Sequence, residues 1–211
     1  MSIIEIKNLT KTYDKKTILN KVNYSIEEGK ITAIIGASGK GKSTLMNIMG
    51  LIEGFDSGDL TILGNKNVKP NSTKAAKIIR ENICYLFQNF ALVDNETVEQ
   101  NLLLALKYVD MSKSQKESLI NEKLKYVGLP GYKSRKIYTL SGGEQQRVAI
   151  ARILVNPKRI ILADEPTGSL DTENRDIIFN YLKNLNKNGS TLIIVTHDKT
   201  IASYCDTIIQ I

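Results

Sequence analysis

Residues 31–43 read ITAIIGASGKGKS, and this stretch indicates the fold more clearly than any other part of the sequence. Residues 31–35 are apolar and rich in β-branched side chains, which predicts a short buried strand. Residues 36–43 match the phosphate-loop pattern G-x-x-x-x-G-K-S/T in full, and residues 42–49 predict the helix that follows. A strand, a glycine-rich loop and a helix in this order predict a nucleotide-binding α/β core rather than an ordinary glycine-rich turn.

The composition of this loop suits a polyphosphate ligand. Its glycines, which lack Cβ atoms, let backbone N–H groups converge on phosphate oxygens, and the helix N-terminus adds a partial positive charge. Lys42 is expected to reach the β and γ phosphates, and the Ser43 hydroxyl is expected to ligate Mg²⁺. We therefore predict that ATP and Mg²⁺ are the cofactors, and that the loop binds ATP through Gly36, Ala37, Ser38, Gly39, Lys40, Gly41, Lys42, Ser43 and Thr44.

A pair of carboxylates follows a second buried strand. Residues 160–165 read IILADE, so Asp164 and Glu165 stand at the carboxyl end of an apolar run, which is the edge where α/β sheets bind ligands. Asp164 is placed to hold Mg²⁺, and Glu165 suits a general base or a water-positioning group. An acidic helix cap after a strand would look the same, but the phosphate loop upstream favours the catalytic interpretation.

A second anion site is predicted at residues 140–147, LSGGEQQR, which lead into an amphipathic helix. Ser141 is a good N-cap residue, and Glu144 stands three residues on, as in a capping box. Gly142 and Gly143 in the first turn each cost about 1 kcal/mol of helix stability relative to alanine. That cost makes sense if a phosphate must approach the backbone closely. The simpler alternative is a well-capped helix without a ligand.

Strand and helix signals alternate outside a helical middle region, which predicts a mostly parallel sheet covered on both faces. Helical periodicity dominates from about residue 72 to residue 156, which indicates a helical subdomain inserted into the α/β core. We expect one domain over residues 1–211, with an ATP-binding core at about 1–88 and 157–211 and the helical subdomain at 89–156. Expected strands are 3–6, 17–26, 31–35, 58–63, 83–87, 160–163, 191–196 and 207–211, and expected helices are 42–49, 73–82, 97–108, 113–127, 143–155, 172–186 and 200–204.

The composition excludes several classes of protein. The apolar share of 42% and the charged share of 24% are those of a globular chain rather than a disordered one. No run of about 20 apolar residues and no signal peptide is visible, so we expect a cytoplasmic location. Cys84 and Cys205 lack a partner motif, so neither a disulfide framework nor a zinc site is expected. The net charge of +7 comes from dispersed lysines, and no nucleic-acid partner is predicted.

Taken together, these motifs resemble those of the ATP-binding cassette (ABC) ATPases. LSGGEQQR is similar to the family signature, and GASGKGKST, Gln88 in YLFQNF, IILADEPTGSLD and THD occur in the family order over the whole chain. The resemblance implies a P-loop NTPase core with an N-terminal antiparallel β-subdomain and an inserted α-helical subdomain. It also implies an ATPase that forms an ATP-dependent, head-to-tail homodimer, in which Ser141, Gly142, Gly143 and Glu144 of one subunit close over the ATP of the other.

The resemblance assigns roles to residues that carry little signal alone. Tyr13 would stack on adenine, with a surface or strand tyrosine as the less favoured alternative, and Gln88 would sense Mg²⁺ at the nucleotide. His197, the one histidine, would contact the γ phosphate, although a lone histidine at a strand end is more often structural. Ser169, Leu170 and Asp171 match a loop that crosses the dimer interface. Lys40 replaces the usual serine of the family and should not abolish binding.

Within the family, TGSLD and GEQQRVAIAR are similar to the macrolide-export and lipoprotein-release branch, and LFQNFALVDNETVEQNL is similar to bacteriocin exporters. This implies an exporter subunit at the cytoplasmic face of the membrane that drives a separate transmembrane permease. Phe87, Phe90, Leu92 and Val93 would offer the permease a docking groove, unless they pack in the core. Two alternatives are an ATPase that transmits force to a membrane partner without transport, and a soluble ABC ATPase that acts on DNA or the ribosome.

Overall fold

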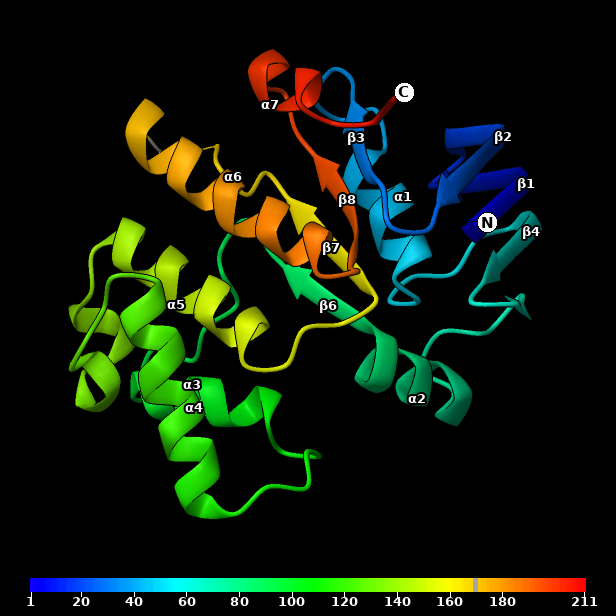
Figure 1. Ribbon diagram of the computed structural model, residues 1–211. Coiled ribbons are helices and arrows are strands. Elements are labelled where there is room, and N and C mark those ends of the chain that lie inside the picture. The colour runs from blue at the N-terminus through cyan, green and yellow to red at the C-terminus, as the bar shows by residue number, and fades with distance from the viewer. Residues whose placement is uncertain (169–170) are drawn as a thin grey trace.

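Two β-sheets form the frame of the protein in the computed structural model, which describes residues 1–168 and 171–211 (Figure 1). The antiparallel sheet has the strand order β2-β1-β4-β5, formed by β1 (Ser2–Tyr13), β2 (Lys16–Glu27), β4 (Ser57–Ile62) and β5 (Asn65–Lys66). The parallel sheet has the order β6-β7-β8-β3-β9, formed by β3 (Ile31–Ile35), β6 (Ile83–Leu86), β7 (Ile160–Asp164), β8 (Thr191–Val195) and β9 (Thr207–Gln210). The expected fold, an α/β core with an N-terminal antiparallel β-subdomain, is confirmed.

The strands of the parallel sheet are apolar on both faces because both faces are covered. In β7, Ile161 and Ala163 belong to one hydrophobic core, whereas Ile160 and Leu162 belong to the other. All four side chains are fully buried. This explains why the strand lacks the alternation of polar and apolar residues that marks a half-exposed strand.

Helices cover the two faces of the parallel sheet differently (Figure 1). On one side lie the antiparallel sheet with α1 (Lys42–Met49) and α2 (Thr73–Asn82). On the other side lie the remaining helices, which share the second core. They are α3 (Val98–Ala105), α4 (Lys113–Tyr126), α5 (Gly142–Leu154), α6 (Thr172–Lys187) and α7 (Lys199–Ser203), with the short 3₁₀ turns η1 (Tyr132–Ser134) and η2 (Ile137–Thr139).

Two of the predicted elements, β1 and α3, differ in length from the sequence prediction by more than two residues. Strand β1 extends to Tyr13 rather than ending at residue 6, because it pairs with β2 along a hairpin whose register is interrupted by bulges. Helix α3 ends at Ala105 rather than at residue 108. There Leu106 N–H donates to the Leu103 carbonyl at 3.0 Å, so the chain leaves the α-helix through a tighter turn.

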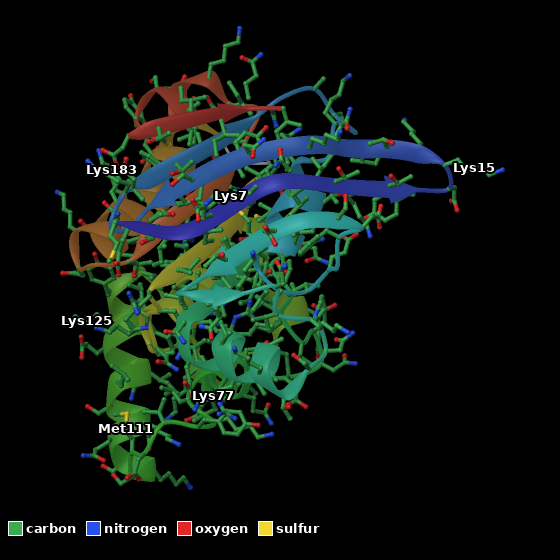
Figure 2. All side chains as sticks on the ribbon, turned by 90° about the vertical axis from the view of Figure 1, so that its right-hand side faces the viewer. Lys7, Lys15, Lys77, Met111, Lys125 and Lys183 are labelled. Atoms are coloured by element: carbon green, nitrogen blue, oxygen red, sulfur yellow. The ribbon has the colours of Figure 1, made fainter. Side chains whose placement is uncertain are left out.

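The surface is basic without concentration in one element. Figure 2 labels lysines on β1, at the β1–β2 turn, on α2, on α4 and on α6, namely Lys7, Lys15, Lys77, Lys125 and Lys183. None of the helices in the described parts of the chain is long and apolar enough to cross a bilayer. Both cysteines are free thiols.

Gly50, which ends α1, marks the closest packing between the helix and the parallel sheet. A Cβ on Gly50 would lie 1.2 Å from the Tyr85 hydroxyl oxygen and 2.8 Å from Leu162 Cδ1. The backbone of Gly50 has φ −86°, a value that any residue adopts. Only the neighbouring side chains therefore demand a glycine here.

We expect Gly50→Ala to lower the free energy of unfolding by about 1–3 kcal/mol, because it overpacks a buried contact. Tyr85→Phe removes the clashing hydroxyl, which has no hydrogen-bond partner among the described residues, and should restore part of the loss in the double variant. Denaturant unfolding measures both effects. Gly54→Ala is the matched control, because a Cβ there meets only Pro70 at 3.9 Å. Equal losses for Gly50→Ala and Gly54→Ala would contradict the packing argument.

Candidate nucleotide-binding site

A cavity of about 470 Å³ opens at the carboxyl edge of the parallel sheet, beside the phosphate loop. It brings together residues from both sheets and from segments far apart in the sequence. Twelve of its lining residues are ones that the sequence predicted: Tyr13, Gly36, Ser38, Gly39, Gly41, Lys42, Ser43, Thr44, Gln88, Asp164, Glu165 and His197. Ile18 and Val195 complete the lining and were not predicted.

The phosphate loop is held in shape by contacts with the rest of the protein. A Cβ on Gly36 would lie 2.4 Å from the Ile211 carbonyl oxygen, and one on Gly41 would lie 2.6 Å from Ile18 Cγ2. These two glycines are therefore required by the protein's own packing, in addition to any ligand. Lys42 Nζ donates hydrogen bonds to the Gly36 and Ala37 carbonyls at 2.9 and 3.1 Å, so the ammonium group lies against the loop. Lys40 is exposed.

The two carboxylates at the end of β7, Asp164 in the strand and Glu165 directly after it, lie in different surroundings. Burial raises the pKa of Asp164, while a hydrogen bond with Ser43 opposes that rise. Glu165 has a left-handed backbone, with φ 45°, and its N–H donates to the Val195 carbonyl at 2.9 Å. Its side chain is only 15% exposed. The turn at Glu165 thus directs its carboxylate toward the end of β8.

His197 meets Glu165 at this point. His197 Nδ1 lies 2.9 Å from Glu165 Oε1, and the His197 backbone N–H donates to Oε2 at 3.4 Å. Because a carboxylate accepts hydrogen bonds and does not donate them, Nδ1 carries the hydrogen. Nε2 is then the ring nitrogen left for a ligand, and the imidazole is 69% exposed. The arrangement holds a carboxylate and an imidazole together at the mouth of the cavity.

The oxygen atoms beside the loop suit Mg²⁺. Ser43 offers a hydroxyl and Asp164 a carboxylate, and these are the donors that Mg²⁺ prefers. Within residues 1–168 and 171–211, no group of three or more His, Cys, Asp and Glu side chains is arranged to hold a metal ion. Mg²⁺ sites that bind nucleotides generally use one or two protein carboxylates and take their other ligands from water and phosphate.

Tyr13 stands in a contact group that the sequence did not reveal. Its hydroxyl donates to Glu53, its ring lies 4.7 Å from Lys11 Nζ, and Lys11 in turn lies 3.1 Å from Glu53 Oε1. These residues come from two separate segments, and no motif or spacing marks them. Tyr13 is 41% exposed, with its hydroxyl bound at the edge of the cavity that Ile18 also lines.

The signature residues lie elsewhere. Ser141 caps α5, and the capping box is confirmed: Glu144 N–H donates to Ser141 Oγ at 3.3 Å, and Ser141 N–H donates to Glu144 Oε2 at 2.8 Å. A Cβ on Gly142 or Gly143 would meet no atom within 4 Å. Among the described residues that line the cavity, none belongs to this segment. One copy of the chain therefore does not bring its signature to its own phosphate loop.

Two further predicted residues, Ser169 and Leu170, lie outside the described residues. Asp171, which follows them, is the N-cap of α6 and accepts a hydrogen bond from Asn174 N–H at 2.9 Å. The pKa of Asp171 is lowered, mainly by this hydrogen bond. Glu144 is likewise engaged, because it accepts a hydrogen bond from the Tyr132 hydroxyl at 2.7 Å, which lowers its pKa.

Comparison with known proteins decides the family. The sequence pattern of the family described as ABC transporter matches residues 19–168, which is most of the chain. This chain belongs to the ABC transporter family. It is an ATPase of the ABC type, and the resemblance predicted from the motifs is confirmed.

Three similar proteins span the cassette. The macrolide export ATP-binding/permease protein MacB of Mannheimia succiniciproducens is 40% identical over the whole chain, which spans about a third (33%) of MacB. The ABC transporter ATP-binding protein YxdL of Bacillus subtilis is 36% identical over the whole chain and 83% of its own length. The ATP-binding cassette MJ0796, solved as a dimer bound to ADP and Pi, has 38% identity and a TM-score of 0.90 over 99% of this chain and 94% of its own.

Asp164 generates a prediction about stability and pH. Because burial raises its pKa in the folded state, ionised Asp164 opposes folding at neutral pH. The stability that comes from protonation is present at low pH and is lost as the pH rises through the folded pKa. Asp164→Asn should therefore raise the free energy of unfolding at pH 7 by roughly 0.5–2 kcal/mol, a range typical of single stabilising substitutions. The gain should shrink as the pH falls toward the pKa of Asp164.

Thermal unfolding between about pH 4 and about pH 8, a range whose lower end reaches the ordinary pKa of a carboxylate, measures this effect. Asp171→Asn is the control of opposite sign, because the pKa of Asp171 is lowered and its ionised form favours the folded state. It should bring no gain at neutral pH. A lower melting temperature for Asp164→Asn at pH 7 would show that burial of this carboxylate is not a cost to the fold.

Proposed function

We propose that this cassette binds ATP with Mg²⁺ in the cavity beside the phosphate loop, and that Glu165 is the general base of hydrolysis. The observation that carries the proposal is the pairing of Glu165 with His197 at 2.9 Å, at the mouth of a cavity that the phosphate loop also lines. A base must lie within reach of the attacking water and keep its lone pairs oriented. The half-buried Glu165 carboxylate, held by the His197 ring and backbone, meets the second requirement.

The binding roles follow from position in the cavity. Tyr13 and Ile18, at the side formed by the antiparallel sheet, would contact the adenine ring of ATP. The loop residues Gly36, Ala37, Ser38, Gly39, Lys40, Gly41, Lys42, Ser43 and Thr44 would bind the phosphates. Lys42 would exchange its two carbonyl contacts for phosphate oxygens. Ser43, Asp164 and Gln88 would hold Mg²⁺, which neutralises charge on the phosphate oxygens when bound.

In the hydrolysis step, Glu165 accepts a proton from the attacking water. The water oxygen forms a bond to the γ phosphorus as the bond to the bridging oxygen of ADP breaks, which gives ADP and phosphate. His197 orients Glu165 through Nδ1, and its Nε2 would be free to contact the γ phosphate. Both residues act through groups that the fold already holds in place, so little reorganisation is needed before reaction.

The signature segment supports a site shared between two copies of the chain. Ser141 and Glu144 cap α5, while Gly142 and Gly143 leave its first turn open to approach from outside. A helix N-terminus of this kind binds anions. We propose that it closes over the γ phosphate of a second copy, giving a head-to-tail homodimer that depends on ATP. The dimeric form of MJ0796 supports this arrangement.

A second cavity, of about 1030 Å³, supports a partner in the membrane. It lies between α2, β6, α3 and the end of α5, and its apolar lining includes Ile79, Phe87, Leu104, Tyr108 and Val109. Leu104 and Tyr108 are 56% and 68% exposed. Of the predicted docking residues, Phe87 lines this groove, whereas Phe90 and Leu92 pack against the core of the helical side.

We propose that a separate permease docks in this groove, which places the cassette at the cytoplasmic face of the membrane. The name of MacB describes an ATP-binding part and a permease part in one protein. YxdL is named as an ATP-binding protein alone, and this chain spans 83% of its length. The names of these relatives and the similar sequence strings support export of an antimicrobial compound, of macrolide or bacteriocin type. We further propose that residues 89–156 act as a helical subdomain between the groove and the core formed by 1–88 and 157–211.

Glu165→Gln tests the hydrolytic role. The variant keeps the shape of the side chain but loses the basic carboxylate, so phosphate release should fall by about 10²–10⁴-fold. ATP binding should survive, and size-exclusion chromatography with Mg-ATP should show a dimer. Lys42→Ala is the contrasting variant, because it should lose both ATP binding and the dimer. Phosphate release near the wild-type rate would mean that the base lies elsewhere, and a slow variant that stays monomeric would contradict the shared site.

Leu104→Glu tests the groove. A carboxylate in an apolar contact is costly to desolvate, so membrane association of the chain in its native cells should fall at least about tenfold. Leu103→Glu is the matched control, because Leu103 lies next to it on α3, is 37% exposed and lines a different cavity. Sedimentation of membranes measures both variants. Equal membrane association of the two variants would place the docking surface elsewhere.

A further inference from the structure

The segment that follows β6 has an unusual backbone. Phe90 and Ala91 are consecutive, neither is glycine, and both lie in the left-handed region, with φ 62° and 45°. Side chains with a Cβ rarely adopt this conformation, and a bulky residue such as phenylalanine does so least readily. Such a conformation persists only where the surrounding structure determines it. The contacts of this segment must therefore include one that holds it.

Arg152, in the last turn of α5, supplies that contact. Its guanidinium donates from Nη1 to the Ala91 carbonyl at 2.5 Å and from Nη2 to the Phe90 carbonyl at 2.8 Å. The side chain is half-buried, and these hydrogen bonds go to backbone carbonyls rather than to a carboxylate. One planar group thus binds the carbonyl oxygens of both left-handed residues, across 61 and 62 positions of sequence.

The same segment reaches the nucleotide cavity. Gln88 stands two residues before Phe90 and lines the cavity beside the phosphate loop. Phe90 N–H donates to the Phe87 carbonyl at 2.9 Å, so Gln88 lies inside the tight turn that Arg152 holds. On the other side, Phe87, Ala91 and Arg152 line the large groove. The turn therefore lies between the two cavities, and its shape decides where Gln88 is placed.

We propose that Arg152 is a positioning residue for ATP hydrolysis, because it binds the left-handed residues Phe90 and Ala91, holds the turn over residues 87–91 in shape and so places Gln88 at the nucleotide. This inference rests on the proposed role of Gln88 at Mg²⁺. Arg152 touches neither nucleotide nor metal and acts through Gln88. Arg152 also lines the large groove, so a partner bound there would contact the guanidinium that holds the turn carrying Gln88.

A lysine cannot replace Arg152 in this role. The guanidinium is flat and carries its donors in a fixed fork, which matches two neighbouring acceptors, whereas an ammonium is a single point on a flexible stem. Arg152→Lys keeps the charge and much of the length. It should therefore free the turn without removing the positive charge from the groove.

Hydrogen exchange of the full chain gives the first test. Amide exchange in residues 86–93 should rise in Arg152→Lys while β7 and β8 stay protected, because the turn loses the group that holds it. Asn156→Ala is the matched control. Asn156 lies just after α5 and also donates to a backbone carbonyl, that of Ala105 at 2.8 Å, but among the described residues its side chain makes no hydrogen bond to the turn. Unchanged exchange in residues 86–93 for Arg152→Lys would overturn the inference.

A double-mutant cycle with Gln88→Ala gives the second test. Arg152→Lys should lower kcat for ATP hydrolysis by about 2- to 30-fold, with a smaller change in the KM for ATP. In the Gln88→Ala background there is no Gln88 side chain left to place, so adding Arg152→Lys should change kcat little further. Asn156→Ala should change kcat by the same factor in the Gln88→Ala background as in the wild-type background. Full additivity of Arg152→Lys with Gln88→Ala would overturn the inference. Wild-type kinetics for Gln88→Ala alone would instead refute the proposed role of Gln88, and the exchange experiment would still decide whether Arg152 holds the turn.

Discussion

The whole site depends on the alignment of three parallel strands, β3, β7 and β8. Ile34 is paired with Val195, and Val195 is paired with Asp164, so the three strands end at the same level. The chain then leaves each strand within one or two residues, at the phosphate loop, at Glu165 and at His197. Because strands buried on both faces admit no register slip without exposing apolar side chains, this alignment is strongly specified. The chemistry at the sheet edge follows from it.

Two groups of the site are held at a cost to the fold. Burial raises the pKa of Asp164, and Glu165 adopts a left-handed backbone. A cation bound beside Asp164 would offset the cost of burying its charge. Strain and buried charge of this kind gather at functional sites, where the surrounding structure can maintain them.

Helix α5 connects the parts that the two cavities separate. Its first residues are capped by Ser141 and open to an outside ligand, its side chain Gln146 donates to the Pro166 carbonyl just after Glu165, and its last turn carries Arg152. One rigid element therefore contacts the segment after β7, the turn that carries Gln88 and the wall of the groove. If a partner shifted this helix, the contacts with all three places would change together, because a packed helix moves as a unit.

The sequence alone determined the parts of this protein that are written in short, local patterns. The phosphate loop, the carboxylates at the end of β7, the capping box of Ser141 and Glu144, and the parallel sheet were all predicted, because each depends on neighbouring residues or on simple periodicity. Tertiary structure decided the rest. The contact of Tyr13 with Glu53 and Lys11, the packing of the partly buried Phe90 against the core and the contact of Arg152 with a turn 61 residues away have no local signature. Such contacts depend on which surfaces the folded chain brings together, and no spacing along the sequence records them.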